Sequence, residues 1–281
     1  MRAAHAKAAA FVGVAGIAGG MATAQAAGPA PGAVPPIAPD VALEAMTSPE
    51  LRARIDAGTT TVLVPVGGTE QNGAHIALGK HNARAALLAS RIAQTLGDAV
   101  VAPVMAYVPE GRVDPPQAHM RWAGTISVPE PAFVALVSGA ADSLCHHGFR
   151  WVLLLGDHGG TQAALQRAAA AVRRPGCTVA ALPEYYRAAQ DDFARRLEAQ
   201  GHAKAEIGQH AGLADTALTL ALAPGLVRPQ MQAAGPSAGT DGDPRRATAE
   251  LGAAGVDRIV ERSVEAIRAL RSPRPARPSR P

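Results

Sequence analysis

The chain has 281 residues, of which 48% are hydrophobic, 18% charged and 3% aromatic. Its net charge is +4, yet four positive charges lie in the C-terminal stretch "RSPRPARPSRP", and Arg2 and Lys7 add two more near the start. The body between these ends therefore carries a charge of about −2. With few aromatic side chains for base stacking, the composition gives no argument for nucleic-acid binding.

Both ends differ from the body in composition. Residues 1–26 carry basic residues, a short Ala-, Val- and Gly-rich stretch and then "AQA" ending at Ala26, which predicts a signal peptide and a periplasmic or secreted protein. The apolar stretch is shorter than a membrane span of about 20 residues, and a retained anchor is the alternative. Residues 27–45 form a Pro-rich lead, and residues 272–281 a basic tail expected to be disordered.

Between these ends, apolar strand patterns alternate with helical patterns. In chain order we expect a helix over 48–58, a strand over 59–66, a helix over 82–97, a strand over 99–108, a helix over 129–148, a strand over 149–160, a helix over 161–174, a strand over 177–186 and helices over 191–201, 214–224 and 256–270. Such alternation predicts one α/β domain over residues 46–271, with a mostly parallel sheet covered by helices on both sides.

The two cysteines, Cys145 and Cys177, are too few for a disulfide framework and too far apart in sequence for a CxxC motif. We expect buried thiols, with a single disulfide as the alternative in an oxidising compartment.

Two polar, Gly-rich turns follow predicted strands directly. "GGTEQNGAH" begins after the strand at 59–66, and "GDHGGTQ" ends the strand at 149–160, so both should meet at the carboxyl edge of the sheet. Glu70, His81 and His158 are ligand types for zinc or manganese, and Asp157 could ligate or support a ligand. The spacing around Lys80 does not fit a phosphate-binding loop, and no GxSxG motif of a serine hydrolase is present.

Four segments in order resemble the creatininase family of metal-dependent amidohydrolases. They are "VPVGGTEQNGAHIALGKH", "GTISV", "HGFRWVLLLGDHGG" and "HAGLADTALTLALAPGLV". The resemblance implies a three-layer α/β/α sandwich, hydrolysis of a cyclic or linear amide with zinc or manganese, and a homo-oligomer, commonly a hexamer in the family. Glu70 and His158 match ligands of the family, and His210 matches its active-site histidine in HAG.

The departures from the family pattern concern the second metal ion. Asn72 stands where the family has a ligand His, and His81 where it has a bridging Asp. The Glu of HAGxxE is Asp215, and Gly159-Gly160 stand where creatininase itself has Tyr-Glu after the ligand His. Two close divalent ions need a bridging anion, which a neutral imidazole does not supply. We therefore expect one ion per chain at Glu70, His81 and His158.

The remaining site residues receive roles from this resemblance and from amide hydrolysis. We expect His210 to move a proton to the leaving nitrogen and Asp215 to orient His210 or act as a base. Asn72 is expected to donate a hydrogen bond to the substrate, with His75 and His119 as further contacts. The long polar loop around His119, "EGRVDPPQAHMRWAGT", is expected to form a rim over the site. The competing interpretation is a periplasmic binding or scaffold protein that has lost catalysis.

Overall fold

The computed structural model describes residues 30–272, so the predicted signal peptide and nearly all of the predicted tail lie outside the described residues. Four strands, β1 (Thr61–Val66), β2 (Ala99–Val101), β3 (Trp151–Gly156) and β4 (Thr178–Ala181), form one sheet in the order β2-β1-β3-β4. Every neighbouring pair is parallel. The predicted α/β class is confirmed, and the parallel pairing follows from the helices between successive strands.

The two central strands alternate their side chains between two apolar cores. Leu63 and Leu153 lie in one core, whereas Val62 and Leu154 lie in the other. Because both faces are buried, the strands are apolar at consecutive positions rather than at every second one. Burying each such side chain contributes about 1.5–3 kcal/mol, so the sheet is a rigid platform for the loops at its edge.

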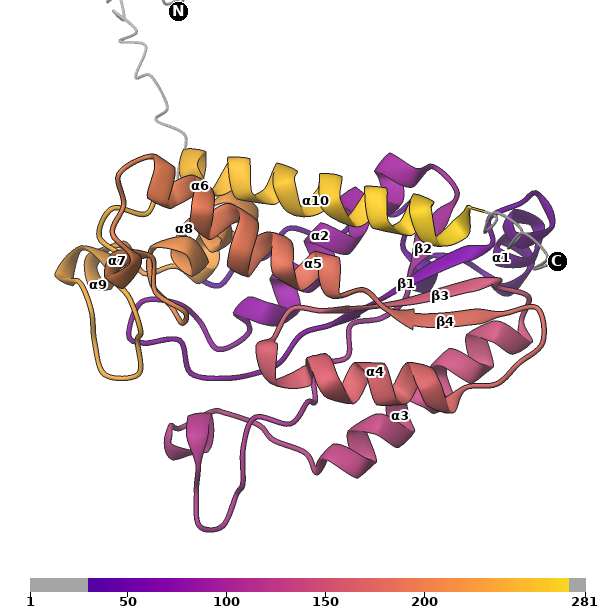
Figure 1. Ribbon diagram of the computed structural model, residues 1–281, viewed down its shortest axis with the longest axis horizontal. Helices are drawn as coiled ribbons and strands as arrows, with labels where there is room; N and C mark the ends of the chain where they lie inside the picture. The colour runs from indigo at the N-terminus through magenta and orange to yellow at the C-terminus, as the bar shows by residue number, and fades with distance from the viewer. Residues whose placement is uncertain (1–29, 273–281) are drawn as a thin grey trace, which may run out of the picture.

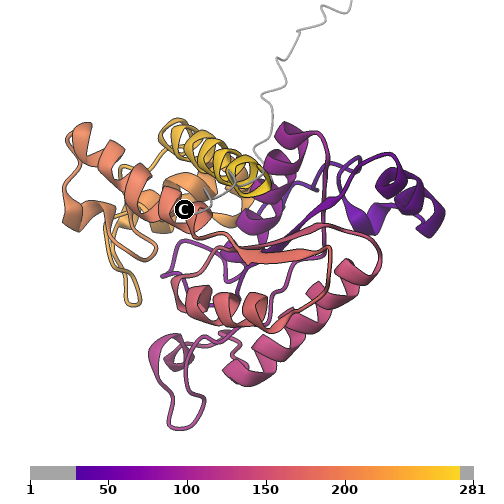
Figure 2. The ribbon, with the colours of Figure 1, turned by 45° about the vertical axis from the view of Figure 1, so that its right-hand side comes forward.

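Helices cover both faces of the sheet, as Figure 1 shows, with α10, α2 and α5 on one side and α3 and α4 on the other. Figure 2 shows the same three layers after a turn of 45° about the vertical axis. The helices are α1 (Ser48–Asp56), α2 (Lys80–Leu96), α3 (Glu130–His146), α4 (Gln162–Ala171), α5 (Pro183–Arg187), α6 (Ala194–Ala199), α7 (Lys204–Ile207), α8 (Leu213–Leu222), α9 (Pro229–Ala234) and α10 (Ala249–Arg271). Short 3₁₀ turns lie at Leu43–Ala45, Ala118–Arg121, Gly159–Thr161 and Pro224–Leu226, and a π-helical turn spans Ala188–Phe193.

Two local predictions need correction. The strand expected over 99–108 ends at Val101, shortly before a proline, which cannot donate to a ladder. The strand expected over 177–186 ends at Ala181, because Pro183 begins helix α5. Within the Pro-rich lead, Ala42 forms a bridge with Val101, so the end of the lead packs onto the sheet.

The expectation of two free thiols is wrong. Cys145, at the end of α3, and Cys177, just before β4, form a disulfide with their Cα atoms 5.7 Å apart. Sequence spacing could not establish this proximity, because it depends on how α3 lies against the sheet.

The order of the strands fixes where a site can form. From β1 the chain goes to β2 on one side, and from β2 it crosses to β3 on the other, so the connections diverge between β1 and β3. In open parallel sheets, ligands bind in the crevice at such a point, beyond the carboxyl ends of the strands. Within residues 30–272, no helix is long and apolar enough to cross a membrane.

Candidate metal centre

Five ionisable side chains gather beyond the carboxyl ends of β1, β2 and β3. Glu70 follows β1, Glu110 follows β2, and His158 follows β3, while His119 lies in the 3₁₀ turn Ala118–Arg121 and His210 shortly before α8. We call these five residues the Glu–His cluster. Both carboxylates are fully buried, and the histidine side chains are only 14–25% exposed.

Two members of the cluster, Glu70 and His158, form with His81 the set of ligands predicted from the sequence. Glu70 Oε1 lies 2.8 Å from His81 Nε2, and Glu70 Oε2 lies 3.3 Å from His158 Nε2. The three residues offer ligand atoms within 4.8 Å of one another. A tetrahedral zinc ion with bonds of about 2.0–2.1 Å needs ligand atoms roughly 3.3 Å apart, so only small shifts would admit an ion.

The carboxylate of Asp157 orients the His81 ring for metal binding. Its Nδ1 lies 2.6 Å from Asp157 Oδ2, which accepts the ring N–H and leaves Nε2 facing Glu70. A carboxylate on the far nitrogen is the usual support of a metal-binding histidine. The supporting role considered for Asp157 in the sequence therefore fits the geometry.

A second group shares Glu70 but uses different histidines. Glu70, His119 and His210 also offer atoms within 4.8 Å of one another. His119 Nε2 lies 3.2 Å from Glu70 Oε2, and His210 Nδ1 lies 3.6 Å from Glu70 Oε1. The two rings face each other with their centroids 4.6 Å apart. The predicted rim loop thus carries a side chain into the site through His119.

Glu110 belongs to the cluster although the sequence analysis did not single it out. Its Oε2 lies 3.3 Å from His158 Nε2. Burial, together with the nearby Glu70 charge, raises the pKa of Glu110 to about 8, despite the opposing effect of His158. A carboxyl group that is protonated near neutral pH can release its proton and become an anionic ligand when a metal cation binds beside it.

The other cluster members have pKa shifts of both signs. Burial alone would raise the pKa of Glu70, but the His158 and His81 rings and Lys80 hold it far below its usual range. Burial and the Lys80 charge lower the pKa of His210 to about 4, and burial also lowers the pKa of His119. The pKa of His158 is raised, because Glu70 and Glu110 outweigh its burial. Perturbed groups of this kind concentrate at functional sites.

A network of ion pairs holds the cluster in place from the first turns of α2. Lys80 Nζ donates to Asp215 Oδ2 at 2.7 Å, and Arg84 bridges Asp215 Oδ1 at 2.6 Å and Asp157 Oδ2 at 2.8 Å. We call Lys80, Arg84, Asp157 and Asp215 the ion-pair network. Tyr185 on α5 completes it by donating to Asp157 Oδ1 at 2.8 Å.

This network changes the role expected for Asp215. Its oxygens are taken by Lys80, Arg84 and the backbone N–H of Ala211, and it makes no hydrogen bond to His210. Burial opposes ionisation, yet these cations hold the pKa of Asp215 well below its usual range. Asp215 therefore does not orient His210 directly. The sequence could not reveal this, because the cations come from α2, more than 130 residues away.

Two residues expected to contact a substrate instead make hydrogen bonds within the protein. The side-chain N–H groups of Asn72 donate to the backbone carbonyls of Glu70 and Ala77, so Asn72 holds its own turn. His75 is fully buried, with Nε2 3.0 Å from Thr216 Oγ1. Of the three expected contacts, only His119 therefore faces the cluster.

The cluster also contains buried polar atoms that have no hydrogen-bond partner and could bind a cation. Glu70 Oε2 and both carboxyl oxygens of Glu110 are buried without a hydrogen-bond partner. Buried polar atoms are rarely left so, and several in one place indicate a group that binds among them. Three carboxylate oxygens and imidazole nitrogens are the donor set of a zinc or manganese ion.

Comparison with known proteins agrees with this geometry. The creatininase family model, described as creatinine amidohydrolase, matches residues 44–267. The chain belongs to the creatininase family. A mutant creatininase has the same fold, with a TM-score of 0.70 and 21% identity over 83% of this chain and 99% of that one. A manganese creatininase covers the same shares of both chains, with a TM-score of 0.69 and 22% identity.

A curated relative extends the family beyond creatininases. The mycofactocin precursor peptide peptidase of Mycolicibacterium smegmatis is 37% identical over 120 residues, which are 41% of this chain and 46% of that protein. The chain thus matches about half the length of this peptidase. Together with the family match, this supports a hydrolase of the creatininase family with residues able to bind a metal.

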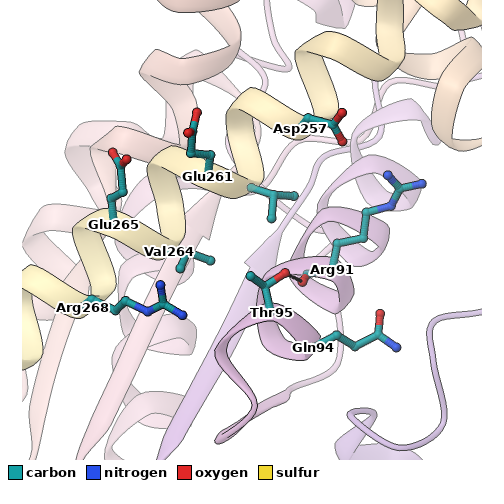
Figure 3. Close-up of a pocket in the computed structure, with 9 residues that line it drawn as sticks. Arg91, Gln94, Thr95, Asp257, Glu261, Val264, Glu265 and Arg268 are labelled. Carbon is teal, nitrogen blue, oxygen red and sulfur yellow. Dashed lines mark hydrogen bonds between the residues drawn. The ribbon is translucent and has the colours of Figure 1, made fainter.

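A groove between α2 and α10 does not contain a comparable set of ligand atoms. Figure 3 shows it between the C-terminal half of α2 and α10, lined by side chains such as Arg91, Gln94 and Glu261. The Glu–His cluster meets α2 at its other end, near Lys80 and His81. The groove has mixed surface charges on an open face, whereas the cluster has buried ligand atoms.

Proposed function

We propose that this protein is a metal-dependent amidohydrolase that cleaves a small cyclic or linear non-peptide amide. The observation that carries the proposal is the set of buried, unpartnered carboxyl oxygens of Glu70 and Glu110 beside His158, supported on one side by the Asp157–His81 pair. Glu70, His81 and His158 would hold one zinc or manganese ion. When bound, such an ion polarises a carbonyl and makes a water molecule more acidic.

The residues of the chain would supply the proton transfers. His210 points Nδ1 at the centre, 3.6 Å from Glu70 Oε1, and this nitrogen is free to accept a proton from the attacking water. The same nitrogen can return that proton to the departing amine, which a neutral leaving group requires. His119 points Nε2 at the same centre from the rim loop and would contact the amide oxygen.

The limited access to the centre supports a small substrate. Glu70 and Glu110 are fully buried, and the surrounding histidine side chains are at most a quarter exposed. A compact amide can reach such a centre with few chain contacts, whereas a peptide would need an extended groove around it. This favours a non-peptide amide over the kind of substrate implied by the name of the peptidase relative.

The direct test measures amine release from a panel of lactams, cyclic ureides, simple carboxamides and short peptides, with Mn²⁺ or Zn²⁺ added at one equivalent. We expect turnover of at least one small amide, its loss with chelator and its return with metal. Turnover of peptides alone would overturn the substrate class. Tight metal binding without turnover of any amide would favour the binding-protein interpretation.

We also propose that the protein works outside the cytoplasm as a homo-oligomer. The Cys145–Cys177 disulfide supports an oxidising compartment, where such bonds persist. Exposed apolar side chains such as Leu136 on α3, 54% exposed, and Tyr107, 58% exposed, support burial by other copies. Fractionation of cells and light scattering of the purified protein test the two statements separately, and a cytoplasmic monomer would contradict both.

A further inference from the structure

Gln71 lies between the two facing histidines of the Glu–His cluster and contacts both. Its side-chain nitrogen is 3.2 Å from His119 Nδ1, and its backbone carbonyl oxygen is 2.8 Å from His210 Nε2. Gln71 itself is buried. One residue therefore touches the nitrogen of each ring that points away from Glu70.

Backbone groups fix which way the Gln71 amide is turned. Its Oε1 accepts the N–H of Gly73 at 2.9 Å, and its Nε2 donates to the carbonyl of Gly239 at 2.8 Å. Exchanging oxygen and nitrogen would place two acceptors and two donors against each other, so the observed orientation is the stable one. The second N–H of Nε2 points toward both rings, because Nε2 lies 3.2 Å from His119 Nδ1 and 3.1 Å from His210 Nε2.

These contacts determine where each ring carries its proton. The Gln71 carbonyl oxygen only accepts and is the shorter contact of His210 Nε2, at 2.8 Å, so His210 carries its proton on Nε2 and presents a bare Nδ1 to Glu70. Because a protonated Nε2 cannot accept from the Gln71 amide nitrogen 3.1 Å away, that amide N–H is left for His119 Nδ1. An amide N–H only donates, so His119 accepts at Nδ1 and carries its proton on Nε2, 3.2 Å from Glu70 Oε2. Both rings have the same tautomer but are turned in opposite directions. The centre thus receives an N–H from His119 and a lone pair from His210.

The backbone beside both histidines shows that their placement is specific. Among residues 30–272, the non-glycine residues with positive φ are Ala118, at 48°, and Ala211, at 53°. Ala118 precedes His119 and Ala211 follows His210. A left-handed alanine costs about 1–2 kcal/mol, and such strain collects where a side chain must be held in one direction.

We propose that Gln71 is a positioning residue that sets the hydrogen-bonding polarity of the site, making His119 a donor to the substrate and His210 an acceptor of the water proton. The same arrangement makes the second group, Glu70, His119 and His210, unfit to bind an ion, because the His119 nitrogen that faces Glu70 carries a proton. The part concerning catalysis rests on the proposed amidohydrolase function.

The step that this polarity serves balances as a hydrolysis. Water adds to the amide carbon, its proton passes to His210 Nδ1, and the carbonyl oxygen accepts the N–H of His119. The C–N bond then breaks as His210 returns the proton to the nitrogen. The products are a carboxylic acid, which ionises, and an amine, and no oxidant or other reactant is consumed.

Metal stoichiometry tests the polarity without any substrate. In Gln71→Glu a carboxylate replaces the amide donor, so His119 should move its proton to Nδ1 and expose a bare Nε2 toward Glu70. We expect wild type to bind one Zn²⁺ per chain and Gln71→Glu to bind two. A second ion in wild type that disappears in His119→Asn would overturn the proposal, because His119 would then be a ligand. An unchanged single ion in Gln71→Glu would also count against it.

Ring-nitrogen NMR of protein labelled with ¹⁵N-histidine reads the protons directly, with His119→Asn and His210→Asn used for assignment. We expect protonated Nε2 on both rings in wild type and protonated Nδ1 on His119 in Gln71→Glu. Protonated Nδ1 on either ring in wild type would overturn the assignment. This arm holds even if no amide is cleaved, so failure of the proposed function remains distinguishable.

Kinetics complete the test once a substrate is known. Gln71→Met should lower kcat about 10–100-fold with little change in metal content, the usual effect of losing an outer partner of a site residue. Gln94→Met, on the exposed face of α2, is the matched control and should leave kcat unchanged. Full kcat in a folded Gln71→Met protein would remove Gln71 from the mechanism.

Discussion

The Glu–His cluster and the ion-pair network are both buried and charged, but they satisfy their polar atoms in different ways. In the network, Lys80 and Arg84 pair with Asp157 and Asp215 at 2.6–2.8 Å, and none of these side chains has a buried atom without a partner among the described residues. In the cluster, carboxyl oxygens of Glu70 and Glu110 have no such partner. The polar atoms of the network are satisfied within the protein, whereas the cluster has carboxyl oxygens that can bind a metal ion.

His81 connects the two regions. It faces Asp157 of the network with one nitrogen and Glu70 of the cluster with the other. The difference between the regions therefore separates a supporting function from a binding function within a few ångströms. Substitutions in the network should act mainly on stability, and substitutions in the cluster mainly on metal binding and turnover.

The largest effect is expected from the cluster. His158→Ala removes a ligand from a loop beyond β3, so metal binding should be lost and hydrolysis should fall by more than about 100-fold, because even outer partners of ligands contribute 10–100-fold. The thermal midpoint of the metal-free protein should change little. Metal analysis and initial rates measure this, with the exposed His146→Ala as a control. If His158→Ala kept its metal, metal binding could not be assigned to the cluster.

The network should respond in the opposite manner. Asp215→Asn leaves Lys80 and Arg84 buried with one carboxylate fewer, which should lower the free energy of unfolding by about 3–5 kcal/mol. Asp56→Asn, which breaks an exposed pair with Arg52, should cost at most about 1 kcal/mol. Urea unfolding measures both. A loss of turnover in Asp215→Asn without a loss of stability would instead make Asp215 a functional group.

Asp157→Asn sharpens the comparison because Asp157 belongs to the network but supports a ligand. It should weaken metal binding about 10–100-fold by loosening the His81 ring, in addition to destabilising the fold. Calorimetric titration with Zn²⁺ measures the affinity. Asp142→Asn, which disturbs a more exposed pair with Arg174, serves as the control. Equal Zn²⁺ affinities in wild type, Asp157→Asn and Asp142→Asn would show that His81 binds the ion without support from Asp157.

The pH dependence of stability gives the smallest and most specific signal. Because the pKa of Asp215 is held below its usual value, its contribution is complete above the unfolded value of about 3.9 and is lost as the pH falls toward the folded value. Stability of metal-free wild type should therefore fall below about pH 4, and less steeply in Asp215→Asn. Equal slopes in unfolding experiments between pH 3 and 5 would contradict this assignment.

Sequence patterns predicted the parts of the site that follow strand ends. Apolar runs located β1 and β3, and the polar residues directly after them, Glu70 and His158, lie together because parallel strands end at one edge. The family resemblance correctly indicated the α/β sandwich. These predictions needed only the order of elements along the chain.

The remainder depended on contacts that no local pattern contains. In the sequence, Lys80 and Arg84 look like surface charges on a helix. Only the packing of α2 against α8 shows that both form ion pairs with Asp215. Glu110 was not identified from the sequence, because it does not directly follow a strand end but lies in the long loop after β2. Gln71 carried no sequence signal of its own, because its importance lies in which nitrogen of each ring it touches.

The central claim is that Glu70, His81 and His158 hold one catalytic ion, and metal stoichiometry with paired variants tests it most directly. The measurement is the content of zinc or manganese after equilibrium dialysis of wild type, Glu70→Gln and Asp215→Asn. The account predicts one ion per chain in wild type and in folded Asp215→Asn, and none in Glu70→Gln. A wild-type protein that binds no ion, or a Glu70→Gln protein that keeps one, would contradict it.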